Sequence, residues 1–326
     1  MDKINTDGIR TAPLRACVVL ARAAVLSLLL ATVSACGDKK AADDAPMSEA
    51  EARYLSEESL WRMQRQEDLT KPDGWTSLIG LHWLSLQSHY VGSGARSGIR
   101  IAMGPASLGM FQRNNGKVFF TPERGLALTL DGQPFKGRVE LKDDSNGPPS
   151  VLGFDEGKGK LTVIERGGNR ALRVKHADAP TRTNFKNIEY WPADRDWRVE
   201  ATFVPNAPGT TLPIATIIGT TENMPNPGAL EFQRDGKSYR IEALDQGETT
   251  LSLIIADRTS GHETYGAGRY LDVPRPDPKG KVVIDFNRAY NPPCAFTPFA
   301  TCPLPPNQNR LDLAITAGEK RYGVKH

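Results

Sequence analysis

The hydrophobic positions of the chain change their spacing near Trp75. Before it, residues 48–69 are rich in helix-forming residues, and Ser48 with Glu51 matches a capping box, so we expect a helix over residues 48–70. After it, short apolar runs with β-branched residues alternate with Gly, Pro, Asn and Asp, which is typical of strands joined by turns. The predicted strands cover residues 118–120, 126–130, 161–164, 172–174, 199–204, 212–218, 239–244, 251–255 and 282–286.

This pattern predicts an all-β protein with two halves and a short N-terminal helix. We expect a β-sandwich over residues 71–168 and a second, β-barrel-like half over residues 169–326. The second half ends in a loop rich in proline and cysteine. Tyr54, Leu55, Trp61 and Met63 are expected to dock the helix on this body. A chain of this length buries a substantial core without metals or disulfides.

The front of the chain has the pattern of an export signal. Residues 1–16 carry Arg10 and Arg15, and an apolar run follows from Ala23 to Val33, which is shorter than the roughly 20 residues of a membrane-spanning helix. The run ends in Val33-Ser34-Ala35-Cys36, which resembles the lipobox of bacterial lipoproteins. This resemblance implies a lipoprotein signal peptide over residues 1–35, a lipidated Cys36 and a flexible tether over residues 36–47. The alternative is an ordinary signal peptide with an incidental cysteine.

Location and charge bear on the expected partners. Gly37 follows the cysteine, and in lipoproteins this favours the outer membrane, so we expect an envelope protein that faces the periplasm. Loss of residues 1–35 removes four basic and two acidic residues, so the net charge falls from +3 to about +1. A nearly neutral chain has no electrostatic reason to bind nucleic acid. No cofactor is predicted, because the glycines form no phosphate-binding motif.

The first half also resembles the forkhead-associated domain. Val91-Gly92-Ser93 followed by Ile99-Arg100-Ile101 is similar to the opening of that family, and Leu130-Asp131-Gly132-Gln133 falls where the family has a tight turn. The family grips phosphothreonine with an arginine after the first glycine and with a Ser-x-x-His loop. This chain has Ser93 and Ser107-Leu108-Gly109-Met110 instead. The resemblance therefore implies a sandwich that does not recognise phosphopeptides.

The second half carries most of the candidate chemistry, beginning at the end of the strand 251–255. His262 and Glu263 could supply a general acid and base, and Arg269 could hold a carboxylate or phosphate with its planar guanidinium. Asp257 and Tyr265 are candidates for ligand binding, because loops at strand ends often carry sites. The alternative is a structural turn, in which such side chains bond to the nearby backbone.

A second polar group follows the strand 282–286. Asn287, Arg288 and Tyr290 either bind a small polar ligand or form a buried hydrogen-bond network that fixes the proline-rich loop. We leave both interpretations open.

Cys294 and Cys302 have three possible roles: a disulfide, metal thiolates or a catalytic thiol. In an exported protein a disulfide is the first expectation, and it would stabilise the loop by about 2–3 kcal/mol. A metal would need two more ligands, for example His82 and His262. No metal site is predicted, because these spacings match no zinc pattern.

Three segments together carry a family resemblance. They are DGWTSLIGLHWL (residues 73–84), GHETYGAGRYL (residues 261–271) and DFNRAYNPPCAFTPFATCPLPP (residues 285–306). In these segments the chain resembles the bacterial family called domain of unknown function 1684, over nearly all of its length after about Leu55. The resemblance implies no particular activity.

Two functional hypotheses follow from the sequence. The first is a lipid-anchored envelope protein that acts as a ligand-binding or structural module. The second is a periplasm-facing hydrolase that uses His262, Glu263 and Arg269 near the proline- and cysteine-rich loop. The first is preferred, because the sequence has no recognised nucleophile, cofactor or metal signature.

Overall fold

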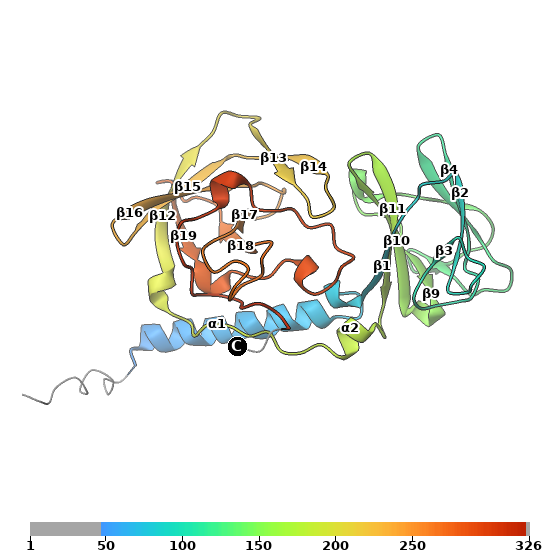
Figure 1. The fold of residues 1–326 in the computed structure, drawn as a ribbon, viewed down its shortest axis with the longest axis horizontal. Coiled ribbons are helices and arrows are strands. Elements are labelled where there is room, and N and C mark those ends of the chain that lie inside the picture. Colours follow the sequence, from blue (N-terminus) through green and yellow to red (C-terminus); the bar gives the residue numbers. More distant parts are fainter. Residues whose placement is uncertain (1–46, 324–326) are drawn as a thin grey trace, which may run out of the picture. The chain divides into compact units, whose positions relative to one another are not determined.

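The structure, a computed structural model, describes residues 47–323 of the chain (Figure 1). The predicted signal peptide of residues 1–35, Cys36 and nearly all of the tether lie outside the described residues. The described chain is mostly β, with one long N-terminal helix, so the all-β fold is confirmed. Among residues 47–323, no helix has both the length and the apolar character to cross a membrane.

The first half is a sandwich of two sheets. One has six strands in the order β1-β11-β10-β9-β6-β7, and the other has five in the order β3-β2-β4-β5-β8. Leu161 and Val163 alternate on β10 and are fully buried against Phe111 and Phe120 of the second sheet. Each such side chain contributes about 1.5–3 kcal/mol on burial. The strands are β1 (Leu78–Trp83), β2 (Ser88–Gly92), β3 (Ile99–Arg100), β4 (Gly109–Asn114), β5 (Lys117–Pro122), β6 (Thr129–Leu130), β7 (Gln133–Pro134), β8 (Val139–Leu141), β9 (Leu152–Phe154), β10 (Gly159–Arg166) and β11 (Asn169–His176).

The division predicted between residues 168 and 169 is wrong, because it cuts a β-hairpin. Strand β11 pairs with β10 along its whole length and also with β1, so it belongs to the sandwich. The turn between them is Gly167-Gly168, in which both glycines have positive φ (58° and 80°). Glycine adopts this conformation without strain, so Gly167 and Gly168 form the tight turn of a hairpin and not a boundary between the halves. The sandwich therefore ends after His176.

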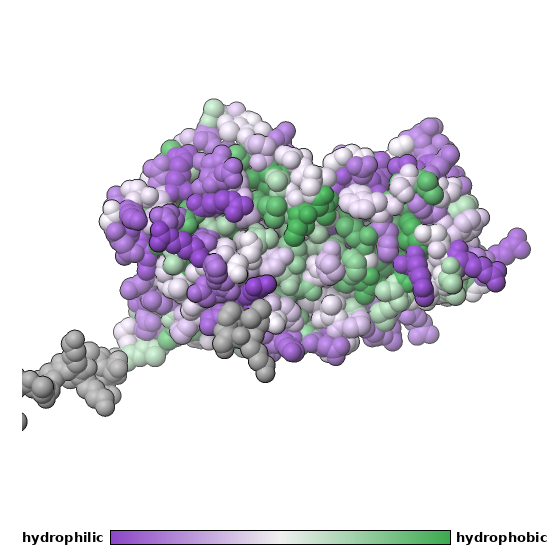
Figure 2. Space-filling model, in the orientation of Figure 1, coloured by the Kyte–Doolittle hydropathy of each residue, from purple (hydrophilic) through white to green (hydrophobic). Residues whose placement is uncertain are grey.

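The second half has a core of its own. A four-stranded sheet in the order β16-β15-β12-β19 and the hairpin β17-β18 surround it, and a bridge between Leu244 and Ser252 joins β16 to β17. The hairpin β13-β14 packs in a separate apolar cluster around Ile214. Leu230, Leu253 and Ile284 lie at its centre, each fully buried. Figure 2 shows mainly hydrophilic residues on the outer face over β15 and β16. The strands are β12 (Arg198–Pro205), β13 (Thr211–Ala215), β14 (Thr221–Pro225), β15 (Gly228–Arg234), β16 (Lys237–Ala243), β17 (Thr250–Ile255), β18 (Arg269–Pro274) and β19 (Lys281–Asp285).

Helix α1 (Glu49–Thr70) docks on the second half mainly through polar side chains. The Tyr54 hydroxyl donates to the Asp285 carboxylate at 3.1 Å, and Arg288 donates to the buried Glu58 at 2.6 Å. Leu69 gives the helix an apolar contact near its last turn. Short helical segments complete the structure near the site: α2 (Pro180–Thr183) and the 3-10 turns Trp75–Ser77, Phe286–Arg288 and Pro293–Ala295.

Candidate functional site

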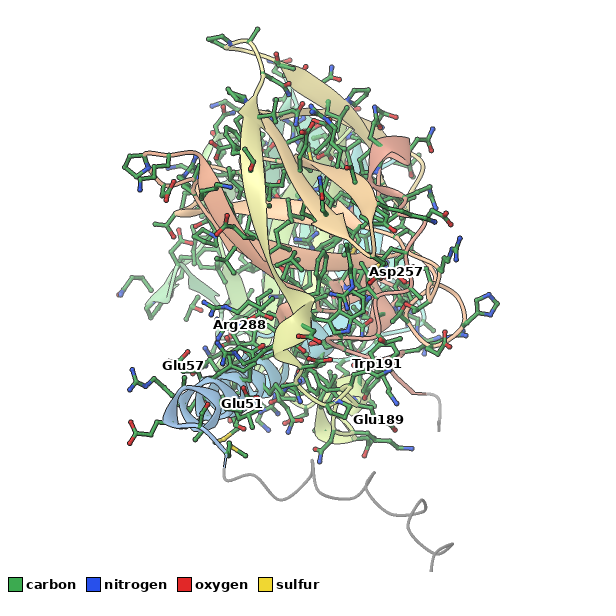
Figure 3. All side chains as sticks on the ribbon, turned by 90° about the vertical axis from the view of Figure 1, so that its left-hand side faces the viewer. Glu51, Glu57, Glu189, Trp191, Asp257 and Arg288 are labelled. Atoms are coloured by element: carbon green, nitrogen blue, oxygen red, sulfur yellow. The ribbon has the colours of Figure 1, made fainter. Side chains whose placement is uncertain are left out.

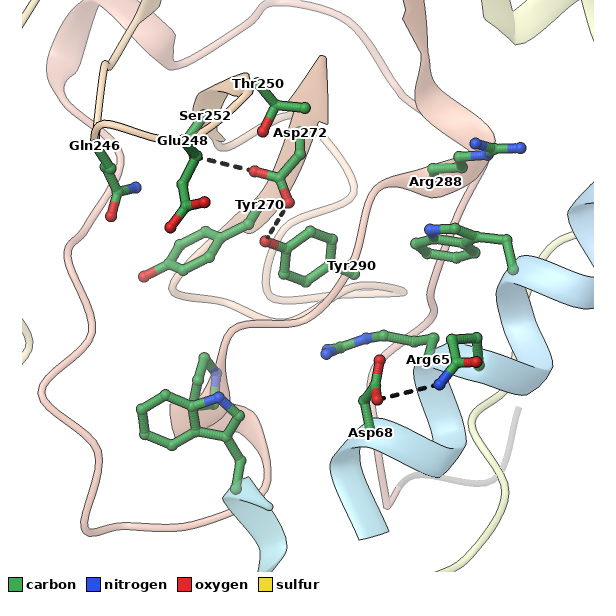
Figure 4. Close-up of a pocket in the computed structure, with 14 residues that line it drawn as sticks. Arg65, Asp68, Gln246, Glu248, Thr250, Ser252, Tyr270, Asp272, Arg288 and Tyr290 are labelled. Carbon is green, nitrogen blue, oxygen red and sulfur yellow. Dashed lines mark hydrogen bonds between the residues drawn. The ribbon is translucent and has the colours of Figure 1, made fainter. Parts of the chain in front are cut away.

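A groove of about 610 Å³ lies between α1, the β17–β18 hairpin and the segment that follows β19 (Figure 4). Its volume is within the range of small-molecule sites, which is about 300–1,000 Å³. The lining combines aromatic rings with carboxylates, amides, hydroxyls and guanidinium groups. The lining residues are Trp61, Gln64, Arg65, Asp68, Trp75, Gln246, Glu248, Thr250, Ser252, Tyr270, Asp272, Arg288, Tyr290 and Pro293.

The hairpin wall of the groove follows from the alternation of β18. Leu271 and Val273 point into the core, so Tyr270 and Asp272 face the other side of the strand. Ser252, which pairs with Asp272 across the hairpin, donates its hydroxyl to Asp272 Oδ1 at 2.9 Å. The Tyr290 hydroxyl donates to Asp272 Oδ2 at 2.9 Å. Asp272 is thus exposed to the groove and held in place by two neutral donors.

The two tyrosines of this wall are protonated at physiological pH. Burial raises the pKa of Tyr270, and it also raises the pKa of Tyr290, where the neighbouring Asp272 carboxylate adds to the effect. Tyr270 donates its hydroxyl to the carbonyl of Pro303 at 2.7 Å, so the ring is fixed on the wall. Both hydroxyls therefore act as hydrogen-bond donors.

Helix α1 and the turn after β19 contribute one arginine each, Arg65 and Arg288, and each is paired with a carboxylate. Arg65 donates from Nε to Glu319 at 2.9 Å and from Nη2 to the Asn291 carbonyl at 2.8 Å. Arg288 donates from Nε to Glu58 at 2.6 Å. Burial raises the pKa of Glu58, although the bond from Arg288 acts in the opposite direction. Both carboxylates are buried beneath the arginines, so the two pairs add no net charge to the groove.

The other charges of the groove are acidic. Asp68, in the last turn of α1, is paired at 2.6 Å with Lys71, the residue just after the helix. Among residues 47–323, Asp272 and Glu248 have no basic side chain in ion-pair contact. Arg275 donates to the backbone carbonyl of Glu248, but both oxygens of Asp245 hold its guanidinium. The groove therefore carries two carboxylates whose charge is not compensated.

Two of the predicted site residues, Arg288 and Tyr290, lie in this groove. Asn287 does not, because it is fully buried and its amide donates to the Tyr54 hydroxyl at 2.8 Å and to the Asp194 carbonyl at 2.7 Å. Its role is to fix α1 and the loop before the 3-10 turn Arg195–Trp197. For Asn287, the structure matches the alternative of a buried network.

Asp257 and Arg269 form a fully buried ion pair at 2.7 Å. Arg269 also donates to the carbonyls of Ile315, at 3.0 Å, and Ala317, so its guanidinium holds the C-terminal segment. Burial lowers the pKa of Arg269, and the Asp257 carboxylate counters this shift. Figure 3 shows Arg288 beside α1 and Asp257 among the loops of the second half. Arg269 has no free face with which to hold a ligand.

The three residues of the hydrolase hypothesis are not brought together in a pocket. The side chains of His262 and Glu263 are exposed, whereas Arg269 is buried. The backbone N–H of His262 bonds to the Thr259 carbonyl at 3.1 Å, which closes a turn. Tyr265 donates to the carbonyl of Cys294 at 3.1 Å and supports the proline-rich loop. This segment has the geometry of the structural turn.

The predicted disulfide is not formed, since Cys294 and Cys302 are both free thiols. They are nevertheless neighbours, and the Cys294 N–H donates to Cys302 Sγ at 3.2 Å. The thiol contact with Cys302 lowers the pKa of Cys294, and the same contact together with burial raises that of Cys302. Hydrogen bonds such as that from Tyr265 hold the loop without a covalent link.

The two histidines proposed as metal ligands, His82 and His262, lie in different halves of the protein. His82 lies on β1, and its Nε2 is buried without a hydrogen-bond partner among the described residues. Burial lowers its pKa, so it is a neutral histidine of the sandwich. His262 is on an exposed turn of the other half.

Sequence reasoning missed most of the groove. Asp272 and Tyr270 carried a usable signal, because they alternate with Leu271 and Val273 in the segment RYLDVP. Arg65 and Trp61 carried no such signal. They lie on α1, and their contact with strands far away in the sequence produces no pattern in the neighbouring residues.

Comparisons with known proteins give a family match and a similar solved structure. Residues 183–320 match the sequence model of the family described as "Protein of unknown function (DUF1684)". One solved structure that is similar to the chain is the NMR solution structure of an uncharacterized protein of Haloarcula marismortui. It is 32% identical, the match covers 43% of this chain and 78% of that protein, and the TM-score is 0.36. No curated protein matches the chain.

Proposed function

Since the chain belongs, through residues 183–320, to the DUF1684 family, whose description names no activity, we propose its function from the groove. The protein is a lipid-anchored envelope protein whose second half binds a small polar ligand. The groove between α1 and β17–β18 carries this proposal: its size, its aromatic lining and its fixed polar groups are those of a ligand site.

The proposed anchor rests on the sequence at Cys36. Val33-Ser34-Ala35-Cys36 supplies the small residues and the thiol that lipoprotein processing requires, and a short polar stretch leads from Cys36 to α1. The acyl chains would hold the protein in the outer membrane, with its body in the periplasm. Mass spectrometry of the mature amino terminus tests this. We expect an acylated Cys36, and a chain that keeps residues 1–35 or has an unmodified thiol would contradict it.

We further propose that the sandwich is related to the forkhead-associated domain but does not bind phosphopeptides. The turn between β6 and β7 supports this, since Asp131 and Gly132 both have positive φ (50° and 82°). Ser93 donates to the Gly104 carbonyl at 2.7 Å and Ser107 donates to Glu123 at 2.9 Å, so neither hydroxyl is free for a phosphate. A phosphothreonine peptide should bind no better than its unphosphorylated form in a calorimetric titration.

Thermal shift of the full chain, purified in detergent, tests ligand binding. A ligand that binds only the folded state raises the melting temperature. We expect at least one compound in a panel of sugars, amino acids, polyamines and quaternary amines to do so with the wild type. Trp61→Leu in the groove should abolish the shift. The matched control is Trp83→Leu on β1, because Trp83 is 38% exposed and does not line the groove.

Two results would contradict the proposal. One is the absence of any shift across the panel with the wild type. The other is a shift that Trp61→Leu leaves intact, because the binding site would then lie elsewhere.

A further inference from the structure

We infer that the groove takes an organic cation, such as a polyamine or a quaternary ammonium compound. This inference rests on the proposed function and adds the chemical class of the ligand. Its basis is the charge left in the groove after every ion pair of the lining is formed, together with the aromatic rings beside that charge.

The charges of the lining favour a cation over an anion. Arg65 and Arg288 are each committed to a buried carboxylate at 2.9 and 2.6 Å. An anionic ligand at either arginine would bring a further negative charge next to the buried Glu319 or Glu58. Asp272 and Glu248, in contrast, line the groove and form no ion pair with a basic side chain of residues 47–323. A positively charged ligand would compensate the negative charge of these two carboxylates.

Asp272 is prepared to accept further hydrogen bonds. Each of its oxygens takes one bond, from Ser252 and from Tyr290, and a carboxylate can accept about four in total. Both donors are neutral hydroxyls, so they orient the carboxylate without cancelling its charge. Figure 4 shows the Glu248 carboxylate on the same side of the groove, beside Tyr270. These two acidic groups therefore define one end of the site.

Aromatic rings provide the second element of cation recognition. The faces of tryptophan and tyrosine attract cations within about 6 Å. The groove already contains one such contact, because the Arg65 guanidinium lies 4.6 Å from the centre of the Tyr290 ring. The Arg173 guanidinium likewise lies over the Trp75 ring, 5.5 Å from its centre. Among the described residues, no cation lies over the rings of Trp61 and Tyr270. We therefore expect these two rings to contact the cationic ligand.

Calorimetric titration of the full chain in detergent tests the inference. The probes are spermidine, which has N–H donors, choline, which has none on its nitrogen, and glucose, which is uncharged. We expect at least one of the two cations to bind and glucose not to bind. Affinity for the cation should fall when NaCl is raised from about 20 mM to about 500 mM, because salt screens exposed charges.

Three variants locate the binding. Asp272→Asn and Glu248→Gln should each weaken cation binding about three- to ten-fold, and the double variant should weaken it further. Asp235→Asn is the matched control. Its side chain is 80% exposed in the β15–β16 turn, outside the groove, and asparagine tolerates its positive φ of 51°. This control should bind like the wild type.

The possible failures are distinguishable. If neither cation binds, or if the double variant binds as the wild type does, the inference is overturned. If glucose or another uncharged compound binds and Trp61→Leu abolishes that binding, the groove is a ligand site of another class and only the inference fails. If no compound of any class binds, the proposed function fails with it.

Discussion

The two faces of the β17–β18 hairpin use aspartate in opposite ways. Behind the hairpin, Asp257 is fully buried against Arg269, and further donors complete its bonding, among them the Thr259 N–H at 2.6 Å. In front of it, Asp272 is exposed and meets only the hydroxyls of Ser252 and Tyr290. The charge of Asp257 is compensated by Arg269 and cannot attract a ligand. The negative charge of Asp272 is not compensated, so it can attract a positively charged ligand. Charge compensation, rather than the presence of polar residues, separates the structural region from the candidate site.

Removing the buried arginine tests the structural side of this comparison and should have the largest effect. Arg269→Ala leaves Asp257 buried without its partner, which typically costs about 3–5 kcal/mol of the free energy of unfolding. Asp257→Asn should also destabilise strongly while keeping the shape of the side chain. Urea denaturation measures both.

The control for this pair lies in the same turn. Arg258→Ala removes an exposed arginine that pairs with Asp312, and it should change stability by less than about 1 kcal/mol. A similar loss for Arg258→Ala and Arg269→Ala would contradict the structural role assigned to the buried pair.

The front carboxylate should behave differently. Asp272→Asn keeps a group that accepts from Ser252, so we expect it to change the free energy of unfolding by less than about 1 kcal/mol. Its effect should appear in ligand affinity instead. Urea denaturation and calorimetric titration on the same preparation separate the two. Destabilisation as large as that caused by Asp257→Asn would remove the distinction between the two faces.

Glu58, beneath the groove, should make stability depend on pH. Burial raises its pKa, so the folded protein binds this proton more tightly than the unfolded chain does. The contribution of this proton to the free energy of unfolding is complete below the ordinary pKa of a glutamate and is lost as the pH rises through the raised value. Urea denaturation between about pH 4 and 8 measures the decline. Glu58→Gln should reduce the slope, and an unchanged slope would assign the decline to another group.

The thiol pair should give the smallest effect. Because Cys294 and Cys302 are free, dithiothreitol should leave the melting temperature unchanged within about 1 °C. A disulfide across this loop would instead lose about 2–3 kcal/mol on reduction. A clear drop in melting temperature with reductant would therefore restore the disulfide.

The sequence predicted the elements that bury continuous apolar runs. The runs 161–164 and 172–174 lie within β10 and β11, and residues 199–204 lie within β12. It missed β15 and β18, because their exposed residues, such as Glu231 and Asp272, interrupt the apolar pattern. Local periodicity reports only what one strand buries.

The site was predicted only where it is local in sequence. Arg288 and Tyr290 follow a predicted strand, so their position was recognisable. The partners of Arg65 and Asp272 come from elements that only tertiary folding brings together. The sequence marks Asp257 and Arg269 as binding candidates, because it cannot show that each neutralises the other in the folded chain.

Helix α1 is attached to the second half by different kinds of contact near its two ends. Near its last turn, Leu69 packs against Ile188 and Phe296, which fixes a pivot. Toward its start it is attached by a hydroxyl at Tyr54 and by the ion pair of Glu58, contacts that ions and water can replace. Between these two ends, Arg65 holds the buried Glu319 at 2.9 Å. Because α1 is also a wall of the groove, loss of the attachments near its start would change the width of the site.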